Sequence, residues 1–440
     1  MTGIELASWS FPVLLALIFI RVPIGLAMAV CGLVGAYFIY GSHAPILNQL
    51  KQVTYSTVSN YNRSVILLFL LMGQFAALGG LSQALFKAAE AWVGHRKGGV
   101  AMAAIGACAG FGAICGSSLA TAATMGQVAL PELKRAGYSG ALSTATLAAG
   151  GTLGILIPPS VGRVISACRT DQNIAKLFLA AFIPGILAAV GYIIVISLYV
   201  RLKPGSAGSM PPMPMAERWK ATFKVWPVLV IFLAVVGGIY TGIFTPTEGA
   251  AVGAFGTGVA AWAAGGINAK TLRNSIYGTA IATGMIFMIV LGAGLYNTFL
   301  ALSQLPQELA QWVIGLGMSP WLVLTTVLVV YLLLGCVMDS LSMILLTIPI
   351  FFPMIMGLDF GMNPEETAIW FGILVLIVVE VGLITPPVGM NLFVINSMAK
   401  DTPIVQTYRG VTPFVISDLV RTAILAAFPA ITLIALRMTS

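Results

Sequence analysis

The sequence predicts an all-α polytopic membrane protein made of two inverted-topology repeats. Three observations predict this class: the composition, a matching series of apolar segments in the two halves, and a Pro-Pro pair in an apolar stretch of each half. Of the 440 residues, 59% are hydrophobic and only 8% are charged, and the mean hydropathy is +0.98. A soluble domain carries roughly a quarter charged residues, so this composition excludes that class.

Apolar segments long enough to cross a ~30 Å hydrocarbon core recur in the same order in both halves. The polar stretch 201–220, rich in Pro, Gly and Ser, separates the halves. The first half contains segments at 9–20, 22–40, 63–80, 99–135, 140–168 and 176–200. The second contains segments at 219–240, 247–266, 276–298, 321–356, 366–400 and 411–436. The common order predicts an internal repeat.

Basic residues orient the two repeats. The interrupted segment 99–135 is flanked by Lys and Arg, whereas the stretches 299–320 and 356–368 beside its counterpart contain none. By the positive-inside rule the first segment enters from the cytoplasm and its counterpart from the other face. Both termini are then outside, and the net charge of +8 reflects loop bias rather than nucleic-acid binding. Four basic residues are exceptions to this orientation: Lys51, Arg63, Arg169 and Lys176.

The two interrupted segments predict re-entrant helical hairpins, because each arm of ~15 residues is too short to span the bilayer. Their tips fall at Ser117 and Ser118 in the first repeat and near Asp339 and Ser340 in the second. Non-helical backbone at membrane depth is tolerated only where protein or a watery cavity covers it. The tips are therefore expected in the interior.

Each repeat also predicts a broken helix at its proline pair, Pro158-Pro159 and Pro386-Pro387. Proline removes a backbone donor, and the freed carbonyl oxygens suit a hard cation such as Na⁺. The N-termini of half-helices favour an anion. A single proline pair could be a simple kink, but discontinuous helices at matching places in two halves indicate the site of a secondary transporter.

We therefore predict two Na⁺ sites, one per repeat, with the substrate between the hairpin tips. The residues of the first cation site are Ser117, Gly154 and Pro158. Those of the second are Asp339, Ser340, Thr385, Pro386 and Asn391. The predicted substrate contacts are Ser117, Ser118, Pro158, Pro159, Arg163 and Pro387.

Some of these residues have a second interpretation. Asp339 would be expensive in an apolar hairpin unless paired or wet, yet it could serve a structural hydrogen bond to the hairpin backbone. Arg163 could snorkel to the interface or meet a substrate carboxylate. Glu380 could support the site or form a contact between domains. Glu248 is predicted to cap its helix.

Two other functional classes compete with transport. An intramembrane serine protease would need a buried His beside its nucleophile, and no predicted span contains His; the paired Asp motif of an aspartyl type is also missing. We therefore expect no enzyme. A channel is the closer rival, because re-entrant loops also line pores, but inverted hairpins with Asp at only one tip fit coupled transport better.

Several motifs carry a resemblance to a known family. They are "GAICGSSLATAATMGQVALPELKRAGYS", "GTLGILIPPS", "FTPTEGAAVGA", "VGLITPPVGMNLFV" and "PFVISDLVR". Over nearly its whole length the chain resembles the large membrane subunit (M, or DctM-type) of tripartite ATP-independent periplasmic (TRAP) transporters. It departs from the family pattern at Arg163, where apolar residues usually follow the first proline pair, which indicates a different specificity or the loss of a usual substrate contact.

The resemblance implies Na⁺-driven symport of an organic acid, such as a C4-dicarboxylate or sialic acid, across the bacterial inner membrane. It implies a small four-helix membrane subunit (Q type), expected as a separate chain, and a periplasmic substrate-binding protein (P type). It also implies an elevator-type fold. The expected parts are a scaffold at 1–80 and 219–298, a transport domain at 81–200 and 299–440, and a cytoplasmic linker at 201–218. A stand-alone Na⁺/organic anion symporter is the alternative.

Overall fold

A computed structural model describes residues 2–315 and 317–438, and every regular element in this part of the chain is helical. The first half contains α1 (Gly3–Phe19), α2 (Ile24–Tyr40), α3 (His43–Val58), η1 (Tyr61–Arg63), α4 (Ser64–Leu78), α5 (Leu81–Val93), α6 (Gly99–Cys115), α7 (Ser118–Arg135), α8 (Gly140–Leu156), α9 (Val161–Thr170) and α10 (Ile174–Leu202). The second half contains α11 (Met215–Phe223), α12 (Trp226–Phe232), the π-helical turn η2 (Leu233–Gly237), α13 (Gly238–Tyr240), α14 (Pro246–Ala263), α15 (Ala269–Ser303), α16 (Leu305–Gly315), α17 (Pro320–Gly335), α18 (Ser340–Met356), α19 (Pro364–Gly382), α20 (Met390–Met398), α21 (Ile404–Ala427) and α22 (Pro429–Arg437).

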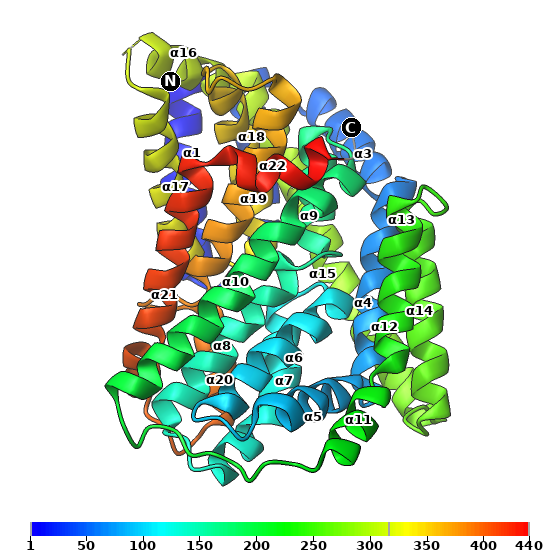
Figure 1. Ribbon diagram of the computed structural model, residues 1–440. Coiled ribbons are helices and arrows are strands. Elements are labelled where there is room, and N and C mark those ends of the chain that lie inside the picture. The colour runs from blue at the N-terminus through cyan, green and yellow to red at the C-terminus, as the bar shows by residue number, and fades with distance from the viewer. Residues whose placement is uncertain (1, 316, 439–440) are drawn as a thin grey trace.

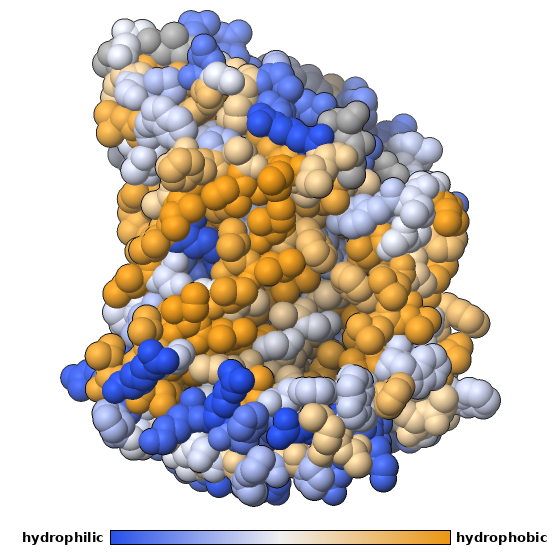
Figure 2. Space-filling model, in the orientation of Figure 1, coloured by the Kyte–Doolittle hydropathy of each residue, from blue (hydrophilic) through white to orange (hydrophobic). Residues whose placement is uncertain are grey.

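The described helices include membrane spans of two kinds. Three helices, α10, α15 and α21, are long and apolar enough to cross a bilayer alone. Three bent pairs reach that length together: α4 with α5, α8 with α9, and α11 with the segment that ends at Tyr240, bent by 62°, 43° and 42°. Figure 2 shows the result on one face of the molecule, where a broad hydrophobic band separates hydrophilic ends.

The two halves run in opposite directions, as the charges predict. In Figure 1 the two marked ends of the chain lie at the top, and the linker between α10 and α11 lies at the bottom. The first broken helix rises from α8 to α9, whereas the second descends from α19 to α20. The prediction of inverted repeats, each with a hairpin and a helix broken at its prolines, is confirmed.

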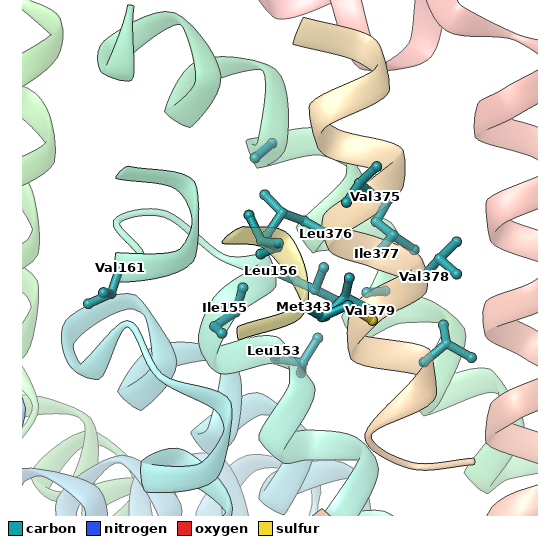
Figure 3. Packing of buried hydrophobic residues seen from close by; sticks show 14 of the residues in the cluster. Leu153, Ile155, Leu156, Val161, Met343, Val375, Leu376, Ile377, Val378 and Val379 are labelled. Atoms are coloured by element: carbon teal, nitrogen blue, oxygen red, sulfur yellow. The ribbon is translucent and has the colours of Figure 1, made fainter. Parts of the chain in front are cut away.

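The long arms of the broken helices form the centre of the core. Every residue from Leu142 to Leu156 in α8 is buried, and so is every residue from Thr367 to Gly382 in α19. A helix that is apolar on all sides is stable only when it is surrounded, and here α6 and α7 pack on α8 while α17 and α18 pack on α19. Figure 3 shows the junction between repeats, where side chains of α8, α18 and α19 meet.

A second group of helices packs in two pairs, α2 with α15 and α4 with α14, which we call the crossed pairs. These pairs combine helices from both repeats, so neither half is an independent unit. Two predicted segments are broken: 219–240 bends between α11 and α12, and 411–436 is two helices, because the chain breaks at Phe428 between α21 and α22. Pro429 begins α22, a position where its missing N–H costs nothing.

Candidate transport site

The two hairpin tips face one small cavity in the interior. The first tip lies between α6 and α7, and the second between α17 and α18. A cavity of about 80 Å³ separates them, lined by four polar residues of the tips and closed by apolar ones from α4 and α15. These residues are Ser117, Ser118, Asp339, Ser340, Leu70 and Ile286. The first four are the tip residues that the sequence predicted to meet.

Each tip ends in a capped helix N-terminus. Ser117 caps α7, accepting a hydrogen bond at Oγ from the Ala120 amide at 3.5 Å. Asp339 caps α18, where its carboxylate accepts from the Ser342 amide at 3.0 Å and from the Ser342 hydroxyl. The interpretation of Asp339 as the acceptor of a structural hydrogen bond from the hairpin backbone is therefore correct. The carboxylate also lines the cavity, and two of its roughly four lone-pair sites remain for a ligand.

Glu380 joins the two tips. It lies on α19 with 1% of its surface exposed, and its Oε1 accepts hydrogen bonds from the Ser340 hydroxyl at 2.8 Å and the Ser118 hydroxyl at 3.4 Å. A single carboxylate oxygen thus links the first residues of α7 and α18. The sequence left Glu380 open between two interpretations; the signal that singles it out is an acidic residue near the end of the otherwise apolar run that follows the polar first turn of α19.

The first broken helix touches its hairpin tip through backbone. A Cβ added to Gly154 would lie 2.6 Å from the Ser117 carbonyl oxygen, and one added to Gly112 would lie 2.7 Å from the Gly154 Cα. The Val161 amide donates to the Gly116 carbonyl at 3.3 Å. Only glycine permits this approach, so Gly154 is placed beside Ser117 as predicted.

The second broken helix repeats this contact. A Cβ added to Gly382 would lie 2.6 Å from the Gly335 backbone, and the Gly389 amide donates to the Cys336 carbonyl at 3.1 Å. Both Pro-Pro peptide bonds are cis. Each repeat therefore brings the unwound segment of its broken helix against its own hairpin tip.

Other predicted residues of the second break have partners of their own. Thr385 donates to the Val381 carbonyl at 2.6 Å. Pro386 and Pro387 are exposed, and the Pro387 carbonyl accepts from the Tyr408 hydroxyl of α21 at 2.7 Å. Asn391 is fully buried and points to the first repeat, where its amide donates to the Ala148 carbonyl of α8 at 3.3 Å. The structure thus packs the Asn391 side chain against α8 of the first repeat, whereas its backbone amide donates to the Leu383 carbonyl of the second break at 3.1 Å.

Arg163 does not snorkel. It is 1% exposed, and its guanidinium donates to the carbonyl of Leu156, the last residue of α8. A cation at a helix C-terminus complements the carbonyls that have no helical partner. Arg163 is absent from the residues that line the cavity, so its observed contact is to the broken helix.

A buried chain of hydrogen bonds connects α8 to α10 and α21. Thr152 bonds to the Tyr192 hydroxyl at 2.9 Å, and that hydroxyl donates to Asp418 at 2.6 Å. Asp418 pairs with Arg421 at 3.0 Å. The pairing of these two residues, three apart on one helix face, is what their spacing favours. Glu248 likewise forms the predicted cap with Thr245.

Comparison with known proteins agrees with this geometry. Residues 11–431 match the family described as "Tripartite ATP-independent periplasmic transporter, DctM component". The chain belongs to this family. It is a family of transporters rather than enzymes, as the sequence led us to expect.

Several TRAP transporter proteins are similar over most of the chain. A C4-dicarboxylate large permease protein, DctM, from Pseudomonas aeruginosa is 37% identical over 91% of this chain and 92% of its own length. A sialic acid large permease protein, SiaM, from Vibrio cholerae is 29% identical over 96% of each. The isethionate permease protein DctMQ of Oleidesulfovibrio alaskensis is 30% identical over 94% of this chain and 63% of its own length.

A solved structure shares the fold. The crystal structure of the YdaH transporter of Alcanivorax borkumensis superimposes with a TM-score of 0.62 over 88% of this chain and 89% of its own, at 15% sequence identity. At that identity the likeness concerns the fold alone. The hairpins and broken helices described above therefore belong to an architecture that a known transporter shares.

Proposed function

We propose that this TRAP large permease performs Na⁺-coupled symport of a small organic acid by an elevator mechanism in the bacterial inner membrane. The observation that carries the proposal is the convergence of two helix N-termini, those of α7 and α18, on one cavity. Each N-terminus carries about half a positive charge and orphan amide donors, and together they favour an anion. The substrate carboxylate is assigned to this cavity, between Ser118 and Ser340.

The same cavity explains a need for cations. Asp339 lines it, and Glu380 lies directly behind the two serines. An anionic substrate would meet these carboxylates at short range, where charge repulsion in a low-dielectric interior is severe. Bound Na⁺ ions would cancel that repulsion, so substrate and Na⁺ bind together or not at all.

The residues present fit two Na⁺ sites. At the first, we assign oxygens of Ser117 and of the stretch from Gly154 to Pro158, where α8 ends and the break begins, and two buried oxygens add to them. Thr121 Oγ1, 2.4 Å from a Cβ added to Gly154, has no partner beyond the weak Cys115 thiol, and Asn391 Oδ1 has none. The second site uses Asp339, Ser340 and the backbone of Thr385 and Pro386. Asn391 is therefore reassigned to the first site in this proposal.

Transport then requires the hairpins and broken helices to move as one body. The cavity is closed by Leu70 of α4 and Ile286 of α15, which belong to the crossed pairs α4–α14 and α2–α15. An apolar contact has no hydrogen-bond register, so it can slide with little penalty. We assign residues 1–80 and 219–298, which include the crossed pairs, to the scaffold and residues 81–200 and 299–440 to the transport domain, with a Q-type membrane subunit and a P-type binding protein as partners.

The volume of the cavity limits the size of the substrate that we propose. About 80 Å³ is far below the roughly 300–1,000 Å³ of typical small-molecule sites, which favours a compact acid. The relatives named for C4-dicarboxylates and isethionate carry compact anions, whereas sialic acid is a larger sugar acid. C4-dicarboxylates are therefore the first class of substrate to test in an uptake assay.

Uptake into proteoliposomes tests the proposal. The chain and its small subunit are reconstituted, and labelled succinate, malate or isethionate is offered with and without the cognate binding protein. Uptake should require both an inward Na⁺ gradient and the binding protein. Uptake with Na⁺ alone would indicate a stand-alone symporter, and flux indifferent to the gradient would indicate a channel; either result rejects the tripartite mechanism.

A further inference from the structure

A large groove runs along the outer surface between α10 and α21, away from the hairpin tips. Its volume is about 960 Å³, at the upper end of the roughly 300–1,000 Å³ of small-molecule sites. Figure 2 shows the surface over these helices as strongly hydrophobic, with hydrophilic residues along its lower edge. The groove plays no part in the transport site described above.

The walls of the groove are aliphatic along most of its length. Branched side chains from both helices line it, among them Val190, Ile194, Leu198, Ile416, Val420 and Ile424. Measured along α10 from Leu187 to Lys203, the lining spans 16 residue steps of about 1.5 Å, or about 24 Å. One leaflet of the hydrocarbon core is about 15 Å thick, so the groove is longer than one acyl chain requires.

Positive charge is concentrated at one end. Lys203 and Arg409 both line the groove, Lys203 at the C-terminal cap of α10 and Arg409 in the second turn of α21. The Lys203 ammonium lies 4.9 Å from the ring centre of Tyr199, which holds it over the mouth. None of the described residues that line the groove is acidic. Arg421, farther along, is already paired with Asp418.

We propose that this groove binds an anionic phospholipid, with an acyl chain along α10 and α21 and its phosphate between Lys203 and Arg409. These residues lie at the end of the molecule that holds the linker (Figure 1), the face that the positive-inside rule makes cytoplasmic. Basic pockets between membrane helices on that face are where anionic headgroups bind. Charge and shape thus agree on one occupant: two cations at the headgroup level and an apolar channel below them.

A protein helix fits the groove less well. Helices associate in membranes through small residues that allow close approach, and the walls here are mainly Val, Leu and Ile around a hollow. A flexible chain fills such a hollow without matching its ridges. The proposal does not depend on Na⁺ coupling or on the identity of the substrate.

Photo-crosslinking tests it directly. The full chain is placed in nanodiscs of phosphatidylethanolamine that contain a minor fraction of phosphatidylglycerol with a diazirine on its acyl chain. After irradiation, mass spectrometry should locate adducts on peptides of α10 and α21. At about fivefold per charge near the surface, the double variant Lys203→Gln/Arg409→Gln should lower adduct yield about 30-fold.

The matched control is Lys220→Gln/Lys224→Gln. It removes the same charge from α11 and its C-cap on the same face, outside the groove, and should leave the yield unchanged. A diazirine phosphatidylcholine that labels the groove as strongly as phosphatidylglycerol would overturn the proposal. Equal losses in both double variants would overturn it as well.

Discussion

The first broken helix, α8–α9, and the second, α19–α20, have the same backbone arrangement but differ in the polar and charged side chains around the break. Both carry a cis Pro-Pro bond and a glycine pressed against a hairpin tip. Six residues before its prolines, however, the first has Thr152 and the second has Glu380. Thr152 faces outward to Tyr192 of α10, whereas Glu380 faces the centre and holds both tips.

The surroundings of the breaks differ as well. Pro158 and Pro159 are buried, and Arg163 binds the carbonyl that precedes them. Pro386 and Pro387 are exposed, and the Tyr408 hydroxyl donates to the Pro387 carbonyl. The comparison teaches that the repeat preserves what makes a broken helix, namely proline and glycine. Charge and hydrogen bonding then give the two broken helices different roles.

The largest effect is expected from Gly154→Ala and Gly382→Ala, because each places a methyl group within 2.6 Å of a hairpin backbone. A tip forced away from its broken helix should abolish Na⁺-driven uptake, with an overpacking cost of about 1–3 kcal/mol in unfolding free energy. Equal loss in both variants means that both breaks are sites.

The control is Gly162→Ala, whose added Cβ meets nothing nearer than 3.4 Å. It should retain uptake. If Gly382→Ala transports normally while Gly154→Ala does not, only the first break contains a site.

Substituting the residue six positions before each proline pair tests whether the two breaks have different roles. Glu380→Gln removes the charge between the tips and should lower uptake at least about tenfold, because one binding step loses more than about 1.4 kcal/mol. Thr152→Val removes two buried hydrogen bonds, to the Tyr192 hydroxyl and the Ala149 carbonyl, each worth about 1 kcal/mol, and should lower thermal stability while uptake keeps its Na⁺ dependence. Uptake assays and thermal unfolding of the purified variants distinguish the two roles. The reverse pattern would mean that Thr152 governs coupling.

Asp339→Asn separates capping from charge. Asparagine caps a helix as well as aspartate does, so the variant should fold and insert normally. If the charge holds Na⁺, the half-saturating Na⁺ concentration for uptake should rise about tenfold, which is about 1.4 kcal/mol. Ser139→Asn, a neutral cap exchanged for another at the start of α8, outside both proposed sites, is the control. An unchanged Na⁺ dependence in Asp339→Asn would make Asp339 a helix cap only.

The smallest effect is expected at an exposed ion pair that joins the two repeats. Lys134 bonds to Asp401 and holds the pKa of that carboxyl below its usual range. A lowered pKa in the folded state stabilises the protein above the unfolded pKa of about 3.9, and the contribution is lost as pH falls through the folded pKa. Both side chains are largely exposed, so solvent screens the pair.

Asp401→Asn should therefore leave the unfolding temperature at neutral pH unchanged within error at physiological salt. Thermal unfolding from pH 7 to pH 3 should show the variant and the wild type converging at low pH. A large destabilisation of the variant at pH 7 would show that this loop contact holds the repeats together.

Much of the architecture was predictable because its causes are local. Hydropathy fixes the spans, loop charge fixes the direction of each repeat, and proline breaks a helix whatever surrounds it. The tips at Ser117 and Asp339 followed from the length of the hairpin arms. Their meeting in one cavity followed from inverted symmetry, since matching elements of inverted halves approach from opposite faces.

Tertiary structure decided which side chains serve these elements. Asn391 follows the second break in sequence, but its side chain lies against α8 of the first repeat, because α20 packs on α7 and α8. Arg163 turns to a carbonyl of α8 and Glu380 to two serines from different hairpins. Such choices depend on which helix faces meet, and no local propensity encodes that. The sequence by itself determined that two helices break beside two hairpins; packing determined which charges lie at the breaks.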